Sequence, residues 1–415
     1  MKHKFLKKAL CIGVACATVA GGMVGMTACG SGGDSTHIWI GVQQATGNNY
    51  ESMCNLLDAL GEEYNFTYTA ELMDRNGDKA LSSIQNAILG GAQGIIAMTD
   101  TDTSTNRSIV ELCEENGAFY AGYMNDFKSI YDPDTTADGF SQADVDYILN
   151  SDNFLGTVTD GDIARDGGTR GEWLFEQISQ SDYRKIVFAH SPTYAYPVAE
   201  TAIDRFVELM NEWNTAHPED QFEVFTEGTS ANSTIYDGAY QLGFGGPGST
   251  VPDSDIAQWM ANGVEAVVAV NSLGNKLLPS IQAANNCNIV IYQIGREDEI
   301  VDEFPDTIKS LCQTPAETIV YPLALILNGI RGTQYTDYPA DKEDTLITGN
   351  YIYLATQEDL TSSVGTCMNF TEGNPVSASL VSVEEFGQLL GDAEGASYKK
   401  LTDLIASWTT ENVIG

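Results

Sequence analysis

Apolar residues recur along the chain in two patterns, helical spacing and short continuous runs. The stretch from Ser83 to Asp102 contains both. Its first half has apolar residues on one helical face and ends at Gly90-Gly91, where glycine permits the left-handed backbone of a helix end. Its second half, residues 94–98, is a continuous apolar run, as in a strand buried on both faces. The pattern predicts a helix that leads into a buried strand.

The same alternation recurs along the chain. Residues 37–126 read as strands separated by helices, which predicts parallel strands joined by crossover helices. The acidic residues 127–152 and the glycine-rich residues 228–255 are expected to be irregular. The runs that we expect to be strands are 38–42, 66–70, 95–98, 119–122, 153–159, 186–189, 222–225, 267–270, 289–292, 308–311 and 351–355.

The first half of the chain is repeated in the second. Residues 89–99 match residues 261–271 position by position, with Gly91 on Gly263. Earlier units pair at smaller offsets, which indicates insertions in the second copy. The sequence therefore predicts an α/β fold of two similar, doubly wound parallel-sheet lobes.

The expected lobes are joined by three hinge crossings, near residues 153, 313 and 350. We expect the first lobe to comprise 37–153 and 314–350 and the second 154–313 and 351–362. Residues 363–415 are expected to form a C-terminal extension.

The N-terminus has the pattern of a secretory signal. Lysine-rich residues 2–8 precede an uncharged run that ends at Ala28. A single transmembrane helix is the alternative reading of this run. Met26-Thr27-Ala28-Cys29 resembles a bacterial lipobox. We expect a signal peptide over 1–28, a lipid on Cys29 and a tether over 29–36, which would place the protein outside the cytoplasm, anchored to the bacterial cell membrane.

The charge of the chain narrows its possible partners, and its cysteines leave the disulfide state open. The chain has 20 Lys and Arg against 58 Asp and Glu, a net charge of −38. Such a surface repels phosphate backbones, so we expect no nucleic-acid partner. Five cysteines lie beyond Cys29, with no CxxC pair. Buried free thiols and a disulfide both remain open.

Motifs of enzymes and cofactor sites are missing or incomplete. Residues 243–248 match GxGxxG, but neither a preceding strand nor a following helix is expected there. No HExxH and no GxSxG occurs, and the histidines after the signal are far apart. We expect no cofactor, no metal and no catalysis. The alternative, a hydrolase with Asp160 and Asp162 as paired carboxylates, is weakened because residues two apart point in different directions.

Polar side chains follow the expected strands in both lobes, at the edge where open α/β sheets bind ligands. Carboxylate, amide and guanidinium groups suit sugar hydroxyls, and an aromatic ring suits the apolar face of a sugar. Any one of these residues could instead cap a helix. The candidate ligand-binding residues are Gln43, Asn49, Tyr50, Asp100, Asn125, Asp126, Asp160, Asp162, His190, Asn271, Arg296 and Gln313.

From about residue 37 to 360 the chain resembles the type I substrate-binding proteins of ABC sugar importers, the ribose-binding-protein group. Residues 308–315 resemble the closing strand of that family, whose Gln-x-Pro implies a ligand role for Gln313. Asn49-Tyr50 resembles its aromatic loop, and Asp126 and Asn271 resemble its strand-end residues. The family's Gly-Phe-Asp is replaced by Ile294-Gly295-Arg296, and the inserts and the extension exceed the usual family length.

This resemblance implies a solute-binding lipoprotein, monomeric, that captures a small polar ligand and delivers it to an ABC permease. The ligand implied is a sugar, and the acid-rich candidate site keeps a cationic ligand or a nucleoside open. A ligand-sensing module that docks on a membrane receptor or kinase is the alternative role.

Overall fold

The structure is a computed structural model. It describes residues 36–42, 48–73, 77–98, 102–124, 141–159, 168–190, 197–225, 241–243, 253–269, 274–293, 307–313, 315–355, 359 and 380–414. Within these residues the strands form two sheets. We call each sheet, with the helices packed on it, the first or the second lobe.

The first sheet has the order β12-β5-β4-β3-β1-β2, and all of its strands are parallel. Its strands are β1 (Thr36–Val42), β2 (Phe66–Leu72), β3 (Gly94–Ala97), β4 (Phe119–Tyr123), β5 (Phe154–Thr159) and β12 (Leu346–Thr348). Helices connect the strands because a parallel pair needs a crossover rather than a hairpin. These helices are α1 (Asn48–Tyr64), α2 (Gly77–Leu89), α3 (Thr103–Asn116) and α4 (Gln142–Asn150).

The second sheet has the order β13-β11-β10-β9-β6-β7, with β8 also paired to β6. Its strands are β6 (Lys185–His190), β7 (Glu223–Val224), β8 (Gln241–Gly243), β9 (Ala266–Ala269), β10 (Val290–Gln293), β11 (Ile308–Gln313) and β13 (Ile352–Leu354). All pairs are parallel except β11 with β13, which is antiparallel. The helices between them are α5 (Gly168–Ser179), α6 (Pro197–Ala216), α7 (Asp253–Ala261) and α8 (Gly274–Ala283).

The two sheets repeat one topology. We number the first five strands of each sheet along the chain, with β8 left out. The second strand then lies on one side of the first, and the third, fourth and fifth follow on the other side, an order of 2-1-3-4-5. The matched glycines confirm the repeat locally: Gly91 ends α2 with φ 100° and Gly263 follows α7 with φ 72°. Both lie in the left-handed region, where glycine is favoured. The predicted α/β fold of two similar lobes is confirmed.

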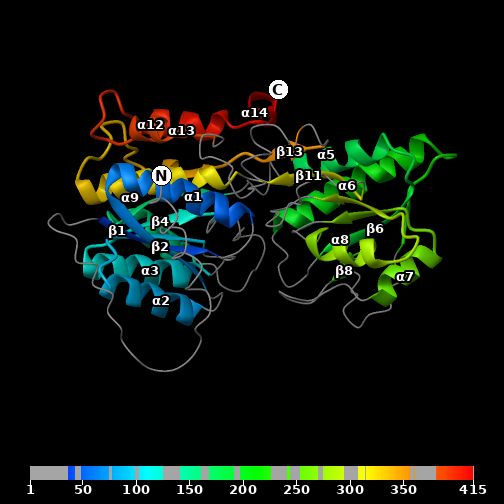
Figure 1. Cartoon of the computed structure of the whole chain (residues 1–415), viewed down its shortest axis with the longest axis horizontal. Helices are drawn as coiled ribbons and strands as arrows, with labels where there is room; N and C mark the ends of the chain where they lie inside the picture. Colours follow the sequence, from blue (N-terminus) through cyan, green and yellow to red (C-terminus); the bar gives the residue numbers. More distant parts are fainter. Residues whose placement is uncertain are drawn as a thin grey trace, which may run out of the picture. The chain divides into compact units, whose positions relative to one another are not determined.

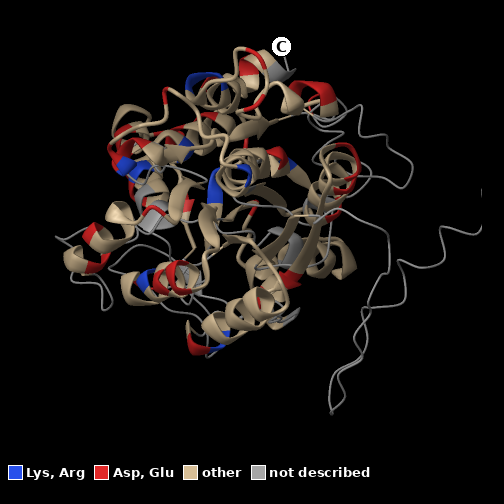
Figure 2. Cartoon of the chain, turned by 90° about the vertical axis from the view of Figure 1, so that its left-hand side faces the viewer, with Lys and Arg blue, Asp and Glu red and all other residues tan. Residues whose placement is uncertain are grey.

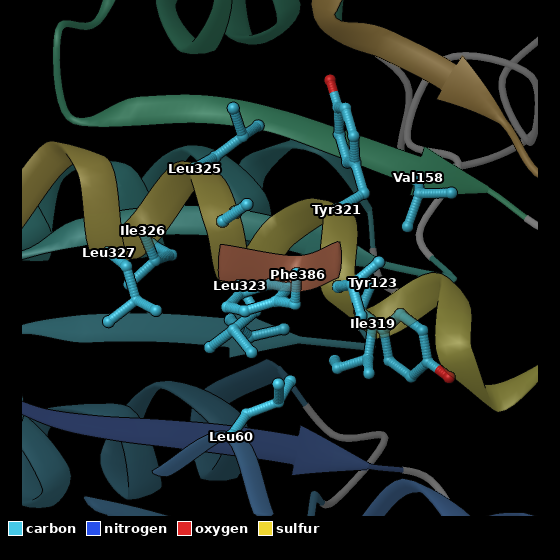
Figure 3. Close-up of a cluster of buried hydrophobic side chains, with 14 of the residues drawn as sticks. Leu60, Tyr123, Val158, Ile319, Tyr321, Leu323, Leu325, Ile326, Leu327 and Phe386 are labelled. Carbon is cyan, nitrogen blue, oxygen red and sulfur yellow. The ribbon is translucent and has the colours of Figure 1, made fainter. Parts of the chain in front are cut away.

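The first sheet is buried on both faces, as its continuous apolar strands predicted. Alternate residues of β1 divide between two cores, with Ile38 and Ile40 in one and Trp39 in the other. Helices α2, α3 and α4 cover the Trp39 face. Helix α1, the 3₁₀ turn η3 (Ala316–Ile319) and helix α9 (Val320–Arg331) cover the opposite face. Figure 3 shows Leu60 of α1, Tyr123 of β4 and Leu323 of α9 in this second core.

The second sheet has the same layering. Helices α5 and α6 cover the face that carries Phe188 and Val268. Helices α7 and α8 cover the face that carries Val187 and Val267, where Trp259 is fully buried. Each sheet therefore has helices packed on both of its faces (Figure 1).

The C-terminal extension belongs to the first lobe. Its helices α12 (Val383–Gly387) and α13 (Tyr398–Ser407) contact α1 and α9 (Figure 1). Phe386 and Leu401 are fully buried in the same core as Leu323. The last helix, α14 (Thr410–Ile414), contacts β13 of the second sheet.

Three features differ from the sequence-based expectations. Helix α4 lies within the acidic segment 127–152, because Val145 and Ile148 give it one apolar face that the acids around them obscure. Strand β8 lies within the glycine-rich insert and ends at Gly243, so a strand does precede the GxGxxG match. Strand β5 pairs in the first sheet, so the chain changes sheet after Thr159, although we expected the second lobe to begin at residue 154. An apolar run in the sequence predicts a strand, but it does not indicate which strand it pairs with.

Candidate functional site

Most of the candidate residues follow the carboxyl ends of described strands in the sequence. In parallel sheets the carboxyl ends of neighbouring strands lie at the same edge. Strands β1 and β5 of the first sheet end immediately before candidate residues, and β3 and β4 end a few residues before them. In the second sheet β9 and β10 also end a few residues before candidates, while His190 and Gln313 are the last residues of β6 and β11.

The strand order singles out one point on each edge. In a sheet of order 2-1-3-4-5 the connections leave the first and third strands in opposite directions, which opens a crevice between their carboxyl ends. In the first sheet these strands are β1 and β3, paired from Ile38–Gly94 onward. Their ends lead to Gln43 and Asp100. In the second sheet β6 and β9 lead to His190 and Asn271. Four of the candidates thus follow or end, in the sequence, the strands that form the two switch points.

Most of the candidates lie just beyond the described strand ends. Asn49, His190 and Gln313 are placed by their backbone alone, in α1, β6 and β11. The candidates outside the described residues are Gln43, Asp100, Asn125, Asp126, Asp160, Asp162, Asn271 and Arg296. The predicted lipidation site, Cys29, also lies outside them.

Tyr50 is the one candidate whose side chain the structure describes. It lies in the first turn of α1, immediately after the loop that follows β1, and packs against the core of the first lobe. Burial, together with the neighbouring Cys54 thiol, raises the pKa of Tyr50 to about 12. The phenol is therefore neutral at physiological pH. The half-buried ring is fixed by the core beneath it, as an aromatic wall of a site requires.

Asp102 shows that an acid at a strand end can have a structural role. It follows β3 and caps α3, with its carboxylate accepting hydrogen bonds from the Thr105 amide and the Ser104 hydroxyl, both at 2.7 Å. Burial alone would raise the pKa of Asp102, but the hydrogen bonds from Ser104 and Thr105 lower it. This is the capping alternative raised for the candidate residues, observed at a neighbour that was not among them.

Sequence reasoning missed an aromatic cluster at the changes of sheet. Arg170 is in the first turn of α5, the helix that follows the first change of sheet, and is only 5% exposed. Its guanidinium lies 3.9 Å from the centre of the Tyr351 ring, immediately before β13. Trp173 and Tyr353 form a second ring pair at 4.8 Å. No spacing in the sequence links residues 170–173 to 351–353.

The surface is strongly acidic. Figure 2 shows Asp and Glu spread over the helices, with far fewer Lys and Arg.

In the described part of the chain no three His, Cys, Asp or Glu side chains converge as metal ligands would. Across the same residues no helix has the length and apolarity needed to cross a bilayer.

Comparison with protein-family models and with the sequences of curated proteins found no match. Solved structures do match. A twin-arginine translocation pathway signal protein from Burkholderia phytofirmans is 13% identical, with a TM-score of 0.51, over 77% of this chain and 89% of its own. An ABC sugar transporter subunit from Rhodobacter sphaeroides 2.4.1 is 12% identical, with a TM-score of 0.49, over 77% and 98%. The transcription regulator CcpA of Lactococcus lactis is 10% identical, with a TM-score of 0.48, over 78% and 98%.

The chain has the fold of the type I periplasmic binding proteins. Two parallel α/β sheets of the same strand order are connected by three passages of the chain, after β5, β11 and β12. At identities this low, the likeness to solved structures concerns the fold.

Proposed function

We propose that the protein is an extracytoplasmic solute-binding lipoprotein that captures a small polar ligand, a sugar, and delivers it to an ABC transporter. The observation that carries the proposal is the repeated 2-1-3-4-5 sheet order, with polar candidates following both switch points. A ligand held by both edges would join the two lobes, and its release would separate them by a hinge motion.

The chemistry of the candidates favours a neutral polyhydroxylated ligand. Gln43 and Asn271 each offer a donor and an acceptor, and Asp100 accepts from two hydroxyl groups. The neutral Tyr50 ring supplies an apolar face for the C–H side of a sugar. No group of this set is proposed as a nucleophile or a general acid, so the proposed function is binding without catalysis.

Isothermal titration calorimetry against a panel of mono- and oligosaccharides tests this function. We expect one sugar to bind, and binding to weaken at least about tenfold in both Asp100→Asn and Asn271→Ala, since each removes a hydrogen bond in a water-poor site. Matched controls lie at the opposite edge of the same sheets: the exposed Asp152 precedes β5 and the exposed Asn262 precedes β9. Asp152→Asn and Asn262→Ala should bind the sugar as the parent protein does.

The panel also includes polyamines, because the net charge of −38 favours cations, and nucleosides, the other ligand class left open by the sequence. Binding of a polyamine or a nucleoside, with no sugar bound, would overturn the sugar assignment and leave solute binding intact. Loss of binding in the control variants as well would show that the site lies elsewhere.

The lipid anchor is proposed from the lipobox-like Met26-Thr27-Ala28-Cys29. Labelling of bacterial cells with a clickable fatty acid should mark the parent protein and leave Cys29→Ala unmarked. The variant should also be recovered from the soluble fraction. An unlabelled parent protein would contradict the proposed anchor.

A further inference from the structure

The C-terminal extension reaches the last passage of the chain between the two sheets. Strand β12 of the first sheet ends at Thr348 and β13 of the second begins at Ile352. The Asn350 side-chain amide donates to the Ala406 carbonyl of α13 at 3.1 Å. The Tyr353 amide donates to the Thr410 hydroxyl of α14 at 3.0 Å. We call residues 406–414 the strap, because they contact this passage and the strand after it.

The strap is anchored in the first lobe. Trp408, two residues before Thr410, is 4% exposed and lies in the core of the first lobe, as does Ile405. Upstream, the Tyr398 hydroxyl pairs with Tyr321 of α9 and donates to the Asp344 carbonyl, both at 2.8 Å. The Asp337 carboxylate accepts the Tyr398 amide at 2.8 Å. Buried aromatic side chains with satisfied hydroxyls hold their position firmly.

The C-terminal extension also packs closely against the first lobe. A Cβ on Gly387 would lie 2.1 Å from the Tyr64 hydroxyl, and one on Gly391 would lie 1.7 Å from the Thr333 carbonyl oxygen. The Tyr64 hydroxyl donates to the Val383 carbonyl at 2.6 Å. Such contacts leave the extension no room to slide over the first lobe.

The strap also contacts residues that pack on β11 and α5, the elements beside the other two passages. Tyr353 of β13 pairs with Cys312 of β11. The second passage follows β11. The Trp173 ring packs on Tyr353 and the Arg170 guanidinium on Tyr351, and both belong to α5, which follows the first passage. A movement of residues 350–353 would therefore also displace β11 and α5, which flank the other two passages.

We propose that residues 406–414 are a hinge strap, which ties the junction at residues 350–353 to the first lobe and restricts the angular motion of the second lobe. The proposal rests on the hinge motion of the proposed function. Rotation at residues 349–351 while the strap stays anchored by Trp408 must break the Thr410–Tyr353 and Asn350–Ala406 hydrogen bonds. A protein without these bonds would sample a wider range of lobe angles.

Spin labels measure this range directly. Glu115 of α3 and Glu212 of α6 are exposed and lie in different lobes, and unnatural amino acids at both carry the labels without altering the native cysteines. We expect the distribution of label distances to be broader in Asn350→Ala/Thr410→Val than in the parent. The matched control is Thr402→Val, whose hydroxyl donates only within α13, to Lys399. The control should keep the parent's distribution.

Hydrogen exchange gives a second readout. The Tyr353 amide should exchange about tenfold faster in Thr410→Val, the effect of losing one hydrogen bond at a strand edge. The amides of α9 should exchange as in the parent, which shows that the first lobe stays folded. Unchanged distance distributions in the double variant would overturn the strap, whatever the exchange rates. Neither measurement uses a ligand, so failure of the strap and failure of sugar binding are separate results.

Discussion

Asp102 illustrates how a single strand-end residue serves the fold. Its carboxylate satisfies the Thr105 amide at the open end of α3, where backbone donors have no partner within the helix. We expect Asp102→Ala to lower the free energy of unfolding by about 1 kcal/mol, and Asp102→Asn by much less, because asparagine also caps helices. Urea denaturation at pH 7 measures both. Equal losses in the two variants would show that the charge, not the cap, matters.

The same residue gives a pH dependence with a defined sign. Hydrogen bonding holds the pKa of Asp102 below its ordinary value, so the folded state binds the proton less tightly than the unfolded chain does. The stabilisation is therefore present above the ordinary aspartate pKa and is lost as pH falls through the lowered pKa. The difference between parent and Asp102→Ala should shrink in that acidic window. A difference that grows towards low pH would contradict this assignment.

At single residues, sequence reasoning succeeded where one residue type meets a backbone need. Gly91 was predicted to end a helix and Gly263 to match it in the repeat, and both follow helices with positive φ. It could not find the Arg170–Tyr351 pair, because that contact depends on where two distant segments come together. All the candidate ligand residues remain predictions, including Tyr50, whose position alone is described.

Among the secondary-structure elements, the helices of the C-terminal extension have a role that the sequence did not predict. The extension was expected without an assigned role, and its helices complete the core over α1 and α9. Short helices with few apolar residues give a weak pattern, and their buried faces are apparent only against the lobe that they cover. Helix α4 was overlooked for the same reason. By contrast, the continuous apolar strands were predicted because burial on both faces removes every polar position.

The extension should therefore contribute strongly to stability. Leu401 of α13 is fully buried in the first lobe. We expect Leu401→Ala to lower the free energy of unfolding of that lobe by about 2–5 kcal/mol, from lost burial and the cavity left behind. The neighbouring Asp403 is exposed, and Asp403→Ala should change it by less than about 0.5 kcal/mol. Denaturation followed by circular dichroism compares the two, and equal stability would mean that α13 is not part of the core.

In the whole molecule, duplication explains both the fold and the site. The same α/β unit occurs twice in the chain and forms two sheets of the same strand order, so each lobe has its own switch point. The repeat was visible in the sequence because buried strands and helix-ending glycines tolerate few residue types. The boundary between the lobes was less visible, since β5 shares its pattern with strands of either sheet.

The charge of the whole molecule predicts a salt dependence of stability. The 20 basic residues can neutralise at most 20 of the 58 acidic charges, so carboxylates repel one another across the surface (Figure 2). Exposed pairs such as Arg205–Glu172 and Arg184–Asp220 are worth less than about 1 kcal/mol each, so their screening costs little. Raising NaCl from about 0.01 to 0.15 M shortens the Debye length from about 30 to 8 Å, which screens the repulsion.

The melting temperature should therefore rise by a few degrees over this range, and KCl should act as NaCl does, because screening depends on ionic strength. Sucrose at the same osmolality is the control, since it stabilises by exclusion without screening charge. A variant with Glu115, Glu212 and Glu219 changed to Gln, all exposed, should show a smaller rise. A melting temperature that stays flat or falls with salt would mean that paired charges outweigh the net repulsion.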